Sequence, residues 1–277
     1  MPELPEVETV RRDLTRAILG RTVETITISR RDILCACRPA DLRRLLPGRR
    51  VEAIARVGKN LILRLSGGPA LIVHLGMTGQ LYTVGAQDEL PDHTHVVLGL
   101  SGDVRVVFRD PRRFGHLELV ADGDLQACTS LRHVGVDARS RAFTAACLQQ
   151  MLAGRKTLVK AALMNQALVA GLGNIYVCEA MHRAGIHPLT RCDELGAAQV
   201  TALHRAIKDV LEEAIRAEGT TISDYVTGAG VPGGFQKRLR VYGREGQSCR
   251  KRGCDGVIER IVQSNRSTFF CPVCQKR

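Results

Sequence analysis

The chain has 277 residues, of which 44% are hydrophobic and 25% are charged. This composition excludes a disordered chain and provides enough apolar side chains for one large or two ordinary folded domains. The formal charge is +12, from 40 Lys and Arg against 28 Asp and Glu, which favours a polyanionic partner, nucleic acid before an anionic membrane surface.

The first 131 residues combine one helix with many short strands. Residues 3–20 have the pattern of an amphipathic helix, because Val7, Val10, Leu14 and Ile18 fall at helical spacing. Short β-rich runs follow, separated by turn signals, at residues 23–28, 60–65, 70–75, 95–100 and 104–108. The pattern predicts an antiparallel sandwich or barrel with the first helix packed against it.

After about residue 131 the helical period returns. We expect helices at residues 143–152, 175–184 and 197–217, with Gly185 and Gly219 as stop signals. The glycine-rich segment 220–236 is predicted to be a flexible loop.

The tail of the chain is basic and carries four cysteines in two pairs. Residues 235–277 hold 11 basic and 3 acidic residues. Cys249 and Cys254 are separated from Cys271 and Cys274 by sixteen residues, a spacing that can place four thiolates around one Zn²⁺. The residues between the pairs alternate like a hairpin, and so short a module would need the metal to fold. Four unconnected thiols, or a redox pair, remain the alternative.

The other six cysteines are interpreted as packing residues or unreactive thiols. Ten cysteines suit a disulfide scaffold only in a small secreted chain, and this sequence has no secretory signal pattern and no run of about 18 apolar residues. We therefore expect a reducing cytoplasm, no membrane span, and no disulfide role for Cys35, Cys37, Cys128, Cys147, Cys178 and Cys192.

The N-terminus is a candidate chemical site. Removal of Met1 would leave Pro2 as a secondary amine, and an α-amino group has a pKa of about 7.7–8.0. Such an amine can attack an electrophilic sugar carbon and form an iminium (Schiff base), while Glu3 and Glu6 could move protons. The same residues are ordinary at the start of a helix, so the residue types alone leave both readings open.

The opening Met1–Val10 resembles that of the bacterial formamidopyrimidine-DNA glycosylases, which repair 8-oxoguanine. Five further segments match family signatures in the same order: Val57-Gly-Lys-Asn-Leu, His74-Leu-Gly-Met-Thr-Gly, Asp110-Pro-Arg-Arg-Phe-Gly, Gly171-Leu-Gly-Asn-Ile-Tyr and Val241-Tyr-Gly-Arg. The cysteine module completes the match, so the resemblance spans essentially the whole chain. One departure is the four-residue interval between Cys249 and Cys254, where the family usually has two.

The resemblance implies an α+β fold in three parts. These are a helix plus an antiparallel β-sandwich in residues 1–131, a helix-two-turn-helix domain with a lesion-recognition loop in 132–235, and a β-hairpin zinc finger in 236–277. It also implies a monomeric bacterial DNA-repair enzyme with one structural Zn²⁺. Its partner would be damaged double-stranded DNA, with no membrane contact. The enzyme would excise oxidised purines and cleave the abasic strand by β,δ-elimination.

Four residues would carry the chemistry that the resemblance implies. Pro2 would attack C1′ of the damaged nucleotide, and Glu3 would assist base departure and ring opening. Lys59 would donate a proton in β-elimination and contact a phosphate. Arg266 matches the arginine assigned to δ-elimination, although a guanidinium that stays charged suits phosphate positioning better than proton release.

Seven more residues match DNA contacts of the family. Met77, Arg112 and Phe114 match the trio inserted where the target base has been flipped out, and their types suit a wedge, a donor to the orphaned cytosine and a stacking ring. Asn174 would cap the helix that begins near residue 175. The remaining matches are His93, Arg155 and Lys160.

Two alternatives stay open from the sequence. One is a related enzyme of the endonuclease VIII type, which removes oxidised pyrimidines; the Glu3-Leu4-Pro5 opening and the intact Arg112 and Phe114 disfavour it. The other is a zinc-dependent nucleic-acid-binding protein that has lost catalysis. The intact Pro2, Glu3, Lys59 and Arg266 disfavour it.

Overall fold

A computed structural model describes residues 2–126, 128–222 and 225–277. The chain divides into two compact units, the first made of residues 1–133 and 215–234 and the second of residues 134–214 and 235–277. Met1, whose removal the sequence leads us to expect, and residues 223 and 224 of the expected flexible loop lie outside the described residues.

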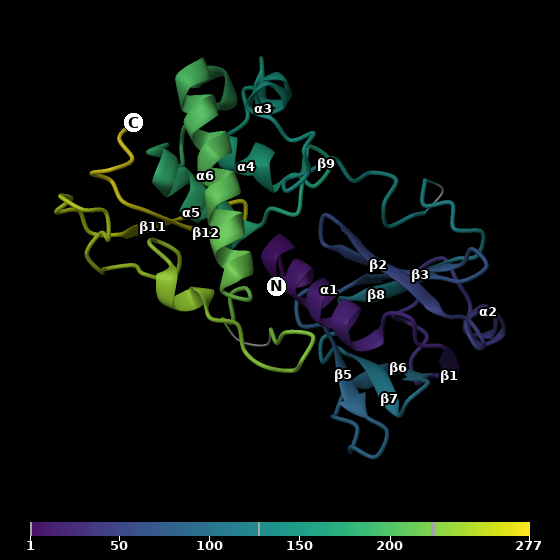
Figure 1. Cartoon of the computed structure of the whole chain (residues 1–277). Helices are drawn as coiled ribbons and strands as arrows, with labels where there is room; N and C mark the ends of the chain where they lie inside the picture. Colours follow the sequence, from purple (N-terminus) through teal and green to yellow (C-terminus); the bar gives the residue numbers. More distant parts are fainter. Residues whose placement is uncertain (1, 127, 223–224) are drawn as a thin grey trace. The chain divides into compact units, whose positions relative to one another are not determined.

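Two four-stranded antiparallel sheets form the first unit (Figure 1). One has the order β1-β6-β7-β5 and the other β2-β3-β4-β8. Side chains from both sheets meet in one apolar core, so the expected antiparallel sandwich is confirmed. The strands are β1 (Val23–Ile28), β2 (Val51–Val57), β3 (Asn60–Leu65), β4 (Ala70–His74), β5 (Gln80–Gly85), β6 (Thr94–Leu100), β7 (Val104–Arg109) and β8 (His116–Val120).

The first helix packs on this sandwich. Helix α1 (Leu4–Ile18) places Val7, Val10, Leu14 and Ile18 in the core with zero exposure, as their spacing predicts. Figure 1 shows it in purple beside β2. A second, short helix, α2 (Pro39–Leu45), was not expected from the sequence and buries only Leu42.

Strands β3 and β4 of the second sheet are buried on both faces. Leu61 and Leu63 of β3 point into the sandwich core, whereas Ile62 packs on the other face with Ile72 and Cys128. The segment after β8 covers this outer face, which explains why β3 and β4 read as continuous apolar runs rather than alternating ones.

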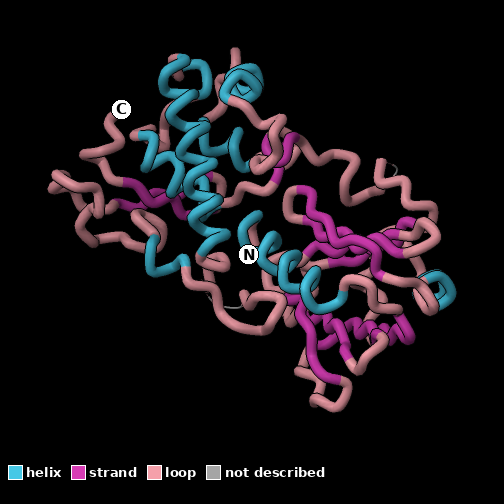
Figure 2. The backbone as a smooth tube through the Cα atoms, in the orientation of Figure 1, coloured by secondary structure: helices cyan, strands magenta, loops and turns pink. Residues whose placement is uncertain are grey.

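Helices and two small sheets make up the second unit (Figure 2). Thr144 caps α3 by accepting a hydrogen bond from Cys147 N at 3.1 Å, so this helix begins two residues later than expected. The elements are β9 (Val136–Asp137), α3 (Ala145–Leu152), α4 (Val159–Met164), β10 (Val169–Ala170), α5 (Asn174–Ala184), α6 (Ala197–Arg216), β11 (Glu259–Gln263) and β12 (Arg266–Phe270), with 3-10 turns at Cys192–Glu194 and Phe235–Arg238.

Helix α5 anchors the C-terminal hairpin. The side chain of Glu179 is fully buried and accepts hydrogen bonds from the backbone N–H groups of Arg240, Val241 and Tyr242 at 2.9–3.0 Å. At the other end of the module, Gln275 donates to the carbonyl of Ile186 at 2.8 Å. Helix α5 therefore holds the chain before the antiparallel pair β11–β12, and Ile186, just beyond that helix, holds the chain after it.

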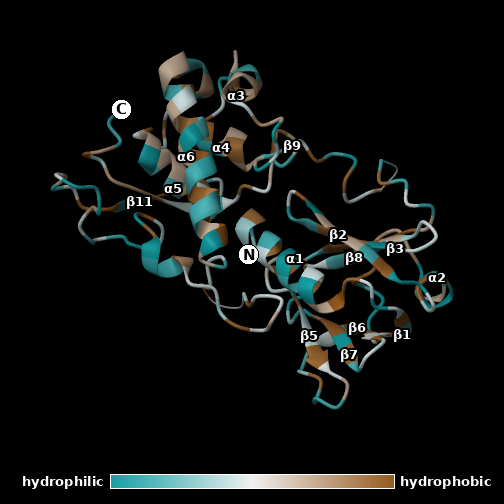
Figure 3. Ribbon diagram, viewed as in Figure 1, coloured by the Kyte–Doolittle hydropathy of each residue, from teal (hydrophilic) through white to brown (hydrophobic). Residues whose placement is uncertain are grey.

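None of the helices in the described part of the chain is long and apolar enough to cross a bilayer. Hydrophilic and hydrophobic residues are mixed along both α1 and α6 (Figure 3), as amphipathic helices require.

The Glu179 carboxylate gives the first testable prediction. Glu179→Gln replaces one acceptor oxygen with an amide donor facing backbone donors, so we expect the free energy of unfolding to fall by about 2–4 kcal/mol. Asp209→Asn is the matched control, because its ion pair with Arg205 lies on the surface and should contribute less than about 1 kcal/mol. Urea unfolding followed by circular dichroism measures both; equal effects of the two substitutions would contradict the anchoring role.

Candidate functional site

The start of α1 is fixed although it lies at the end of the chain. Pro2 is buried and Glu3 is only 2% exposed. Glu6 holds this segment through both carboxylate oxygens: Oε2 accepts from the N–H of Glu3 at 2.8 Å, and Oε1 accepts from the N–H of Thr220 at 2.7 Å. The N-terminal residues are thus tied to the segment that returns to the first unit after α6.

Tyr225 adds a second link between α1 and the segment that follows α6. Its hydroxyl donates to the carbonyl oxygens of Glu218 at 3.0 Å and Glu6 at 3.4 Å. Burial, and then the charge of Glu6, raises the pKa of this hydroxyl well above its ordinary value. The group therefore stays a hydrogen-bond donor at neutral pH.

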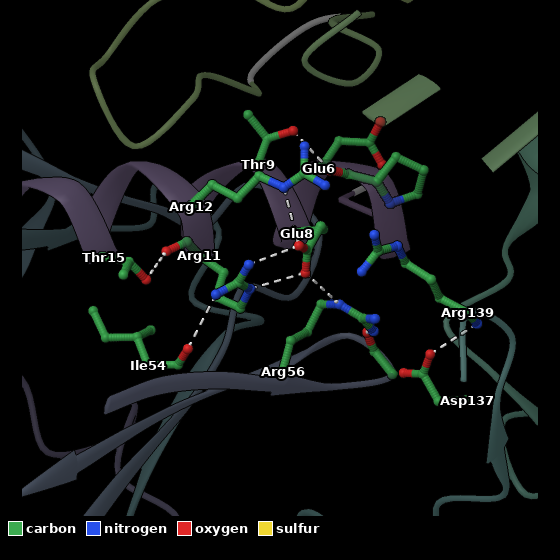
Figure 4. Close-up of polar contacts among 12 residues, drawn as sticks. Glu6, Glu8, Thr9, Arg11, Arg12, Thr15, Ile54, Arg56, Asp137 and Arg139 are labelled. Carbon is green, nitrogen blue, oxygen red and sulfur yellow. Dashed lines mark hydrogen bonds and ion pairs between the residues drawn. The ribbon is translucent and has the colours of Figure 1, made fainter. Parts of the chain in front are cut away.

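A buried ion-pair network links α1 to the turn that carries Lys59 (Figure 4). The Glu8 carboxylate accepts from Arg11 of its own helix at 2.9 Å and from Arg56 Nε of β2 at 3.2 Å. Arg56 is 5% exposed and also donates from Nη1 to the carbonyl of Gly58 at 2.7 Å. Lys59, the next residue, is 8% exposed. No motif in the sequence marks Glu8 or Arg56 as site residues.

A pair of stacked imidazoles lies on the neighbouring strands. The rings of His74 and His116 are 5.1 Å apart and inclined by 11°, and their strands pair in register. Burial, then the charges of His116 and Lys59, lowers the pKa of His74 to about 4. His74 is therefore neutral near Lys59 at pH 7, with Nδ1 accepting from the N–H of Gly76. The sequence signal for His74 was its place in a signature; His116 had none.

Two loops present large side chains to solvent. Met77 is 40% exposed and Phe114 is 53% exposed, and the Arg112 guanidinium lies 4.7 Å from the centre of the Phe114 ring. A single exposed apolar side chain is ordinary, but these two lie on loops that pack against each other, and Phe114 carries an arginine over its ring. The sequence-predicted trio is thus gathered on one pair of loops.

Asp110 and Gly76 hold these loops together. The fully buried Asp110 carboxylate accepts from Thr78 Oγ1 at 2.5 Å and from the N–H of Gly115 at 2.7 Å. Gly76 has a φ of +61°, and a Cβ there would meet backbone atoms of the opposite loop at 2.4 Å, so only glycine fits. The exposed His93 joins the cluster, since its carbonyl accepts from the Asp110 N–H at 3.1 Å.

In the second unit, Lys160 and Asn174 donate hydrogen bonds to the β11–β12 hairpin. Lys160 is 3% exposed and donates to Thr268 Oγ1 at 2.6 Å. Asn174 Nδ2 donates to the carbonyl of Ser267 at 2.8 Å. The expectation that Asn174 caps α5 is wrong: Gly173 is the capping residue, and the Asn174 amide is engaged by the hairpin carbonyl instead.

A cavity of about 270 Å³ opens beside this contact. Residues in and beside α4, both apolar and polar, form one wall, and polar residues of the hairpin form the other. Arg266, at the start of β12, is exposed and lies at its rim. Arg155 is also exposed, and its Nε donates to the carbonyl of Met151 at 2.6 Å. The residues around the cavity are Leu158, Lys160, Ala161, Met164, Asn165, Gln263, Ser264 and Arg266.

The four cysteines of the tail form one cluster. Their Sγ atoms all lie within 4.8 Å of one another, and the distances that bear on geometry are 3.7 Å for Cys249–Cys274, 3.6 Å for Cys254–Cys271 and 3.0 Å for Cys254–Cys274. A tetrahedral zinc site with Zn–S bonds of about 2.3 Å requires sulfurs roughly 3.8 Å apart. The donor set and its spacing therefore fit one structural Zn²⁺, despite the longer interval between the first two ligands.

The wider first knuckle closes through its backbone. The N–H of Cys249 donates to the carbonyl of Gly256 at 2.8 Å, which brings both ends of the loop together. A Cβ on Gly256 would lie 2.5 Å from Cys271 Sγ, so this position must be glycine for the cluster to form.

Three models of known families match successive parts of the chain. Residues 1–117 match the formamidopyrimidine-DNA glycosylase N-terminal domain, residues 134–226 the formamidopyrimidine-DNA glycosylase H2TH domain, and residues 246–277 a zinc finger found in FPG and IleRS.

Curated relatives and solved structures are similar to this chain over its full length. The chain is 45% identical to the formamidopyrimidine-DNA glycosylase of a Cereibacter sphaeroides strain, covering 100% of both chains, and 43% identical to that of a Methylobacterium species, covering 99% of both. It is similar to a Lactococcus lactis FPG mutant solved with Fapy-dG-containing DNA (TM-score 0.92, 32% identity, 100% of both chains). It is also similar to the MutM (FPG) protein of Thermus thermophilus (TM-score 0.88, 39% identity, 99% of this chain and 98% of that one). The chain belongs to the formamidopyrimidine-DNA glycosylase family.

Proposed function

We propose that this protein excises oxidised purines, chiefly 8-oxoguanine and formamidopyrimidines, from duplex DNA and then cleaves the abasic strand. The observation that carries the proposal is the start of α1, where Pro2 is buried and Glu6 holds the N–H of Glu3, in a chain that belongs to this family. The enzyme would work as a monomer with one structural Zn²⁺, in the bacterial cytoplasm where its DNA substrate lies.

The reaction starts at the amine of Pro2. Its nitrogen attacks C1′ of the damaged nucleotide, the bond from C1′ to the base breaks with its electron pair going to the base, and the base takes up the proton that the amine loses. Glu3 delivers a proton to the ring oxygen, so the sugar opens and an iminium ion forms between Pro2 and C1′. A carboxylic acid only 2% exposed is suited to this proton transfer, because little water competes with it.

Strand cleavage follows from the iminium ion. Loss of a proton from C2′ expels the phosphate on the 3′ side, and a second elimination expels the phosphate on the 5′ side. In this proposal Lys59 donates a proton during the first elimination and contacts a phosphate, while Arg266 holds a phosphate and offsets its charge. Water finally hydrolyses the iminium and releases Pro2.

Extrusion of the damaged base requires side chains that replace it in the stack. Met77 and Phe114 are proposed as the wedge, and Arg112 as the donor to the orphaned cytosine. Their exposure and the contact of Arg112 with the Phe114 ring support this assignment. His93, whose loop is tied to Asp110, is proposed to contact the DNA backbone beside them.

Contacts to the phosphates in the second unit are proposed for Arg155, Lys160 and Asn174. Arg155 is exposed, whereas Lys160 and Asn174 are held by the hairpin that carries Arg266. The 11 basic and 3 acidic residues of 235–277 supply the long-range attraction to DNA. When bound, zinc supplies folding energy to the hairpin rather than chemistry, because four cysteines occupy all its ligand positions.

The nucleophile can be tested directly. Pro2→Gly removes the secondary amine, so sodium borohydride should trap at least about 100-fold less covalent protein–DNA adduct on an 8-oxoguanine duplex. Pro39→Ala, which alters a proline at the start of another helix, is the control and should trap as the wild type does. Unchanged strand incision by Pro2→Gly would show that the assigned nucleophile is wrong.

The substrate class separates this function from the endonuclease VIII type. Excision from a duplex holding 8-oxoguanine opposite cytosine should be faster than from one holding thymine glycol, measured with the same enzyme under single-turnover conditions. Faster excision of thymine glycol would favour the alternative enzyme. Absence of excision from both, with retained DNA binding, would favour a binding protein without catalysis.

Removal of zinc gives a separate prediction. Chelation should unfold the hairpin and weaken duplex binding by on the order of tenfold or more, because the module has little core of its own. Returning one equivalent of Zn²⁺ should restore binding. DNA affinity is measured by fluorescence anisotropy at fixed salt, and an affinity unaffected by complete zinc removal would contradict the assignment.

A further inference from the structure

His182 is a buried side chain beside the cysteine cluster, and the chemistry proposed above gives it no role. It lies in the last turn of α5 and is 1% exposed. Its Nε2 atom is 3.5 Å from Sγ of Cys249. Cys178, one helical turn earlier, packs into the same apolar cluster as Cys271, so this face of α5 is directed towards the zinc finger.

The surroundings of the imidazole decide which nitrogen carries the proton. Nδ1 of His182 is buried and has no hydrogen-bond partner among the residues that the structure describes. A proton on Nδ1 would be a buried donor without an acceptor, which costs free energy, whereas a lone pair there costs less. The ring is therefore neutral with its proton on Nε2, the atom that faces Cys249.

The chemistry of the cysteine points to the same arrangement. A thiolate bound to Zn²⁺ can only accept hydrogen bonds, so the contact with Nε2 must be N–H donating to sulfur. The backbone N–H of Lys251 also donates to Cys249 Sγ, at 3.4 Å. Four thiolates and one Zn²⁺ carry a net charge of −2, and donors to sulfur reduce the charge that each ligand bears.

We propose that His182 is a positioning residue for zinc: its Nε2–H group holds the Cys249 thiolate in its ligand rotamer and lowers the charge on that sulfur. The four-residue interval between Cys249 and Cys254 explains why such a donor is needed. A longer loop has more conformational freedom, so a donor from a rigid helix fixes the first ligand from outside the loop. The inference concerns zinc retention and does not depend on the proposed enzyme activity.

The test measures zinc release from the full-length, zinc-loaded protein into a chromophoric chelator. His182→Phe keeps the ring and removes the donor, so we expect release to be about tenfold faster. His182→Gln keeps an N–H group at a similar reach and should release zinc within about twofold of the wild-type rate. His182→Leu also lacks a donor, so we expect it to release zinc as fast as His182→Phe does. It replaces His182→Phe in the test if that variant does not fold.

His204→Phe is the matched control. His204 also makes one hydrogen bond through Nε2, to the carbonyl of Phe143 at 2.9 Å, in the same unit. Losing it can lower stability, but it should leave the zinc release rate unchanged. The proposal would be overturned if His182→Phe and His182→Leu released zinc at the wild-type rate. It would also be overturned if His182→Gln released zinc as fast as His182→Phe does.

Cobalt substitution supplies a readout that a packing role would not change. In the Co²⁺-loaded protein, loss of a hydrogen bond to sulfur should move the thiolate-to-cobalt charge-transfer band to lower energy in His182→Phe. The band should stay near its wild-type position in His182→Gln. An unmoved band in both variants would show that His182 makes no hydrogen bond to the ligand.

Discussion

The proposed chemistry depends on keeping the first residues of the chain in place. Chain termini usually fray, because few contacts repay the conformational entropy of ordering them. Glu6 provides that order here: its carboxylate accepts from the N–H of Glu3 and from the N–H of Thr220, a residue more than 200 positions away in sequence. Pro2 therefore stands at the start of a helix whose entry is fixed by a buried charge.

Other buried carboxylates do the same for the remaining parts of the site. Glu8 connects α1 to Arg56, which holds the carbonyl just before Lys59. Asp110 gathers the loops that present Met77, Arg112 and Phe114. Glu179 holds the backbone that leads into the zinc finger. Each carboxylate is buried yet satisfied by donors, the condition under which an internal charge is tolerated.

These anchors also explain where sequence reasoning succeeded and where it failed. The spacing of Val7, Val10, Leu14 and Ile18 predicted α1, because burial of one face imposes that period. Strand β2 escaped prediction, since Glu52, Ala53 and Ala55 are residues common in helices and only pairing with β3 makes the segment extended.

Among the site residues, too, some could be predicted from the sequence and others could not. Pro2, Lys59 and the cysteines could be named because they lie in short motifs. The partners that fix them could not, since Arg56, His116 and His182 meet their neighbours only after folding. Asn174 was expected to cap its own helix, but its side-chain amide donates instead to a carbonyl of the hairpin, far along the chain. Contacts between distant segments carry no local sequence signal.

The position of the covalent bond to DNA shows which residue is the nucleophile. After borohydride trapping on an 8-oxoguanine duplex, the protein should be digested and the modified peptide identified by mass spectrometry. We expect the sugar remnant to be attached to the nitrogen of Pro2 in a chain that has lost Met1. Attachment to Lys59, to Lys160 or to any other lysine would contradict this expectation.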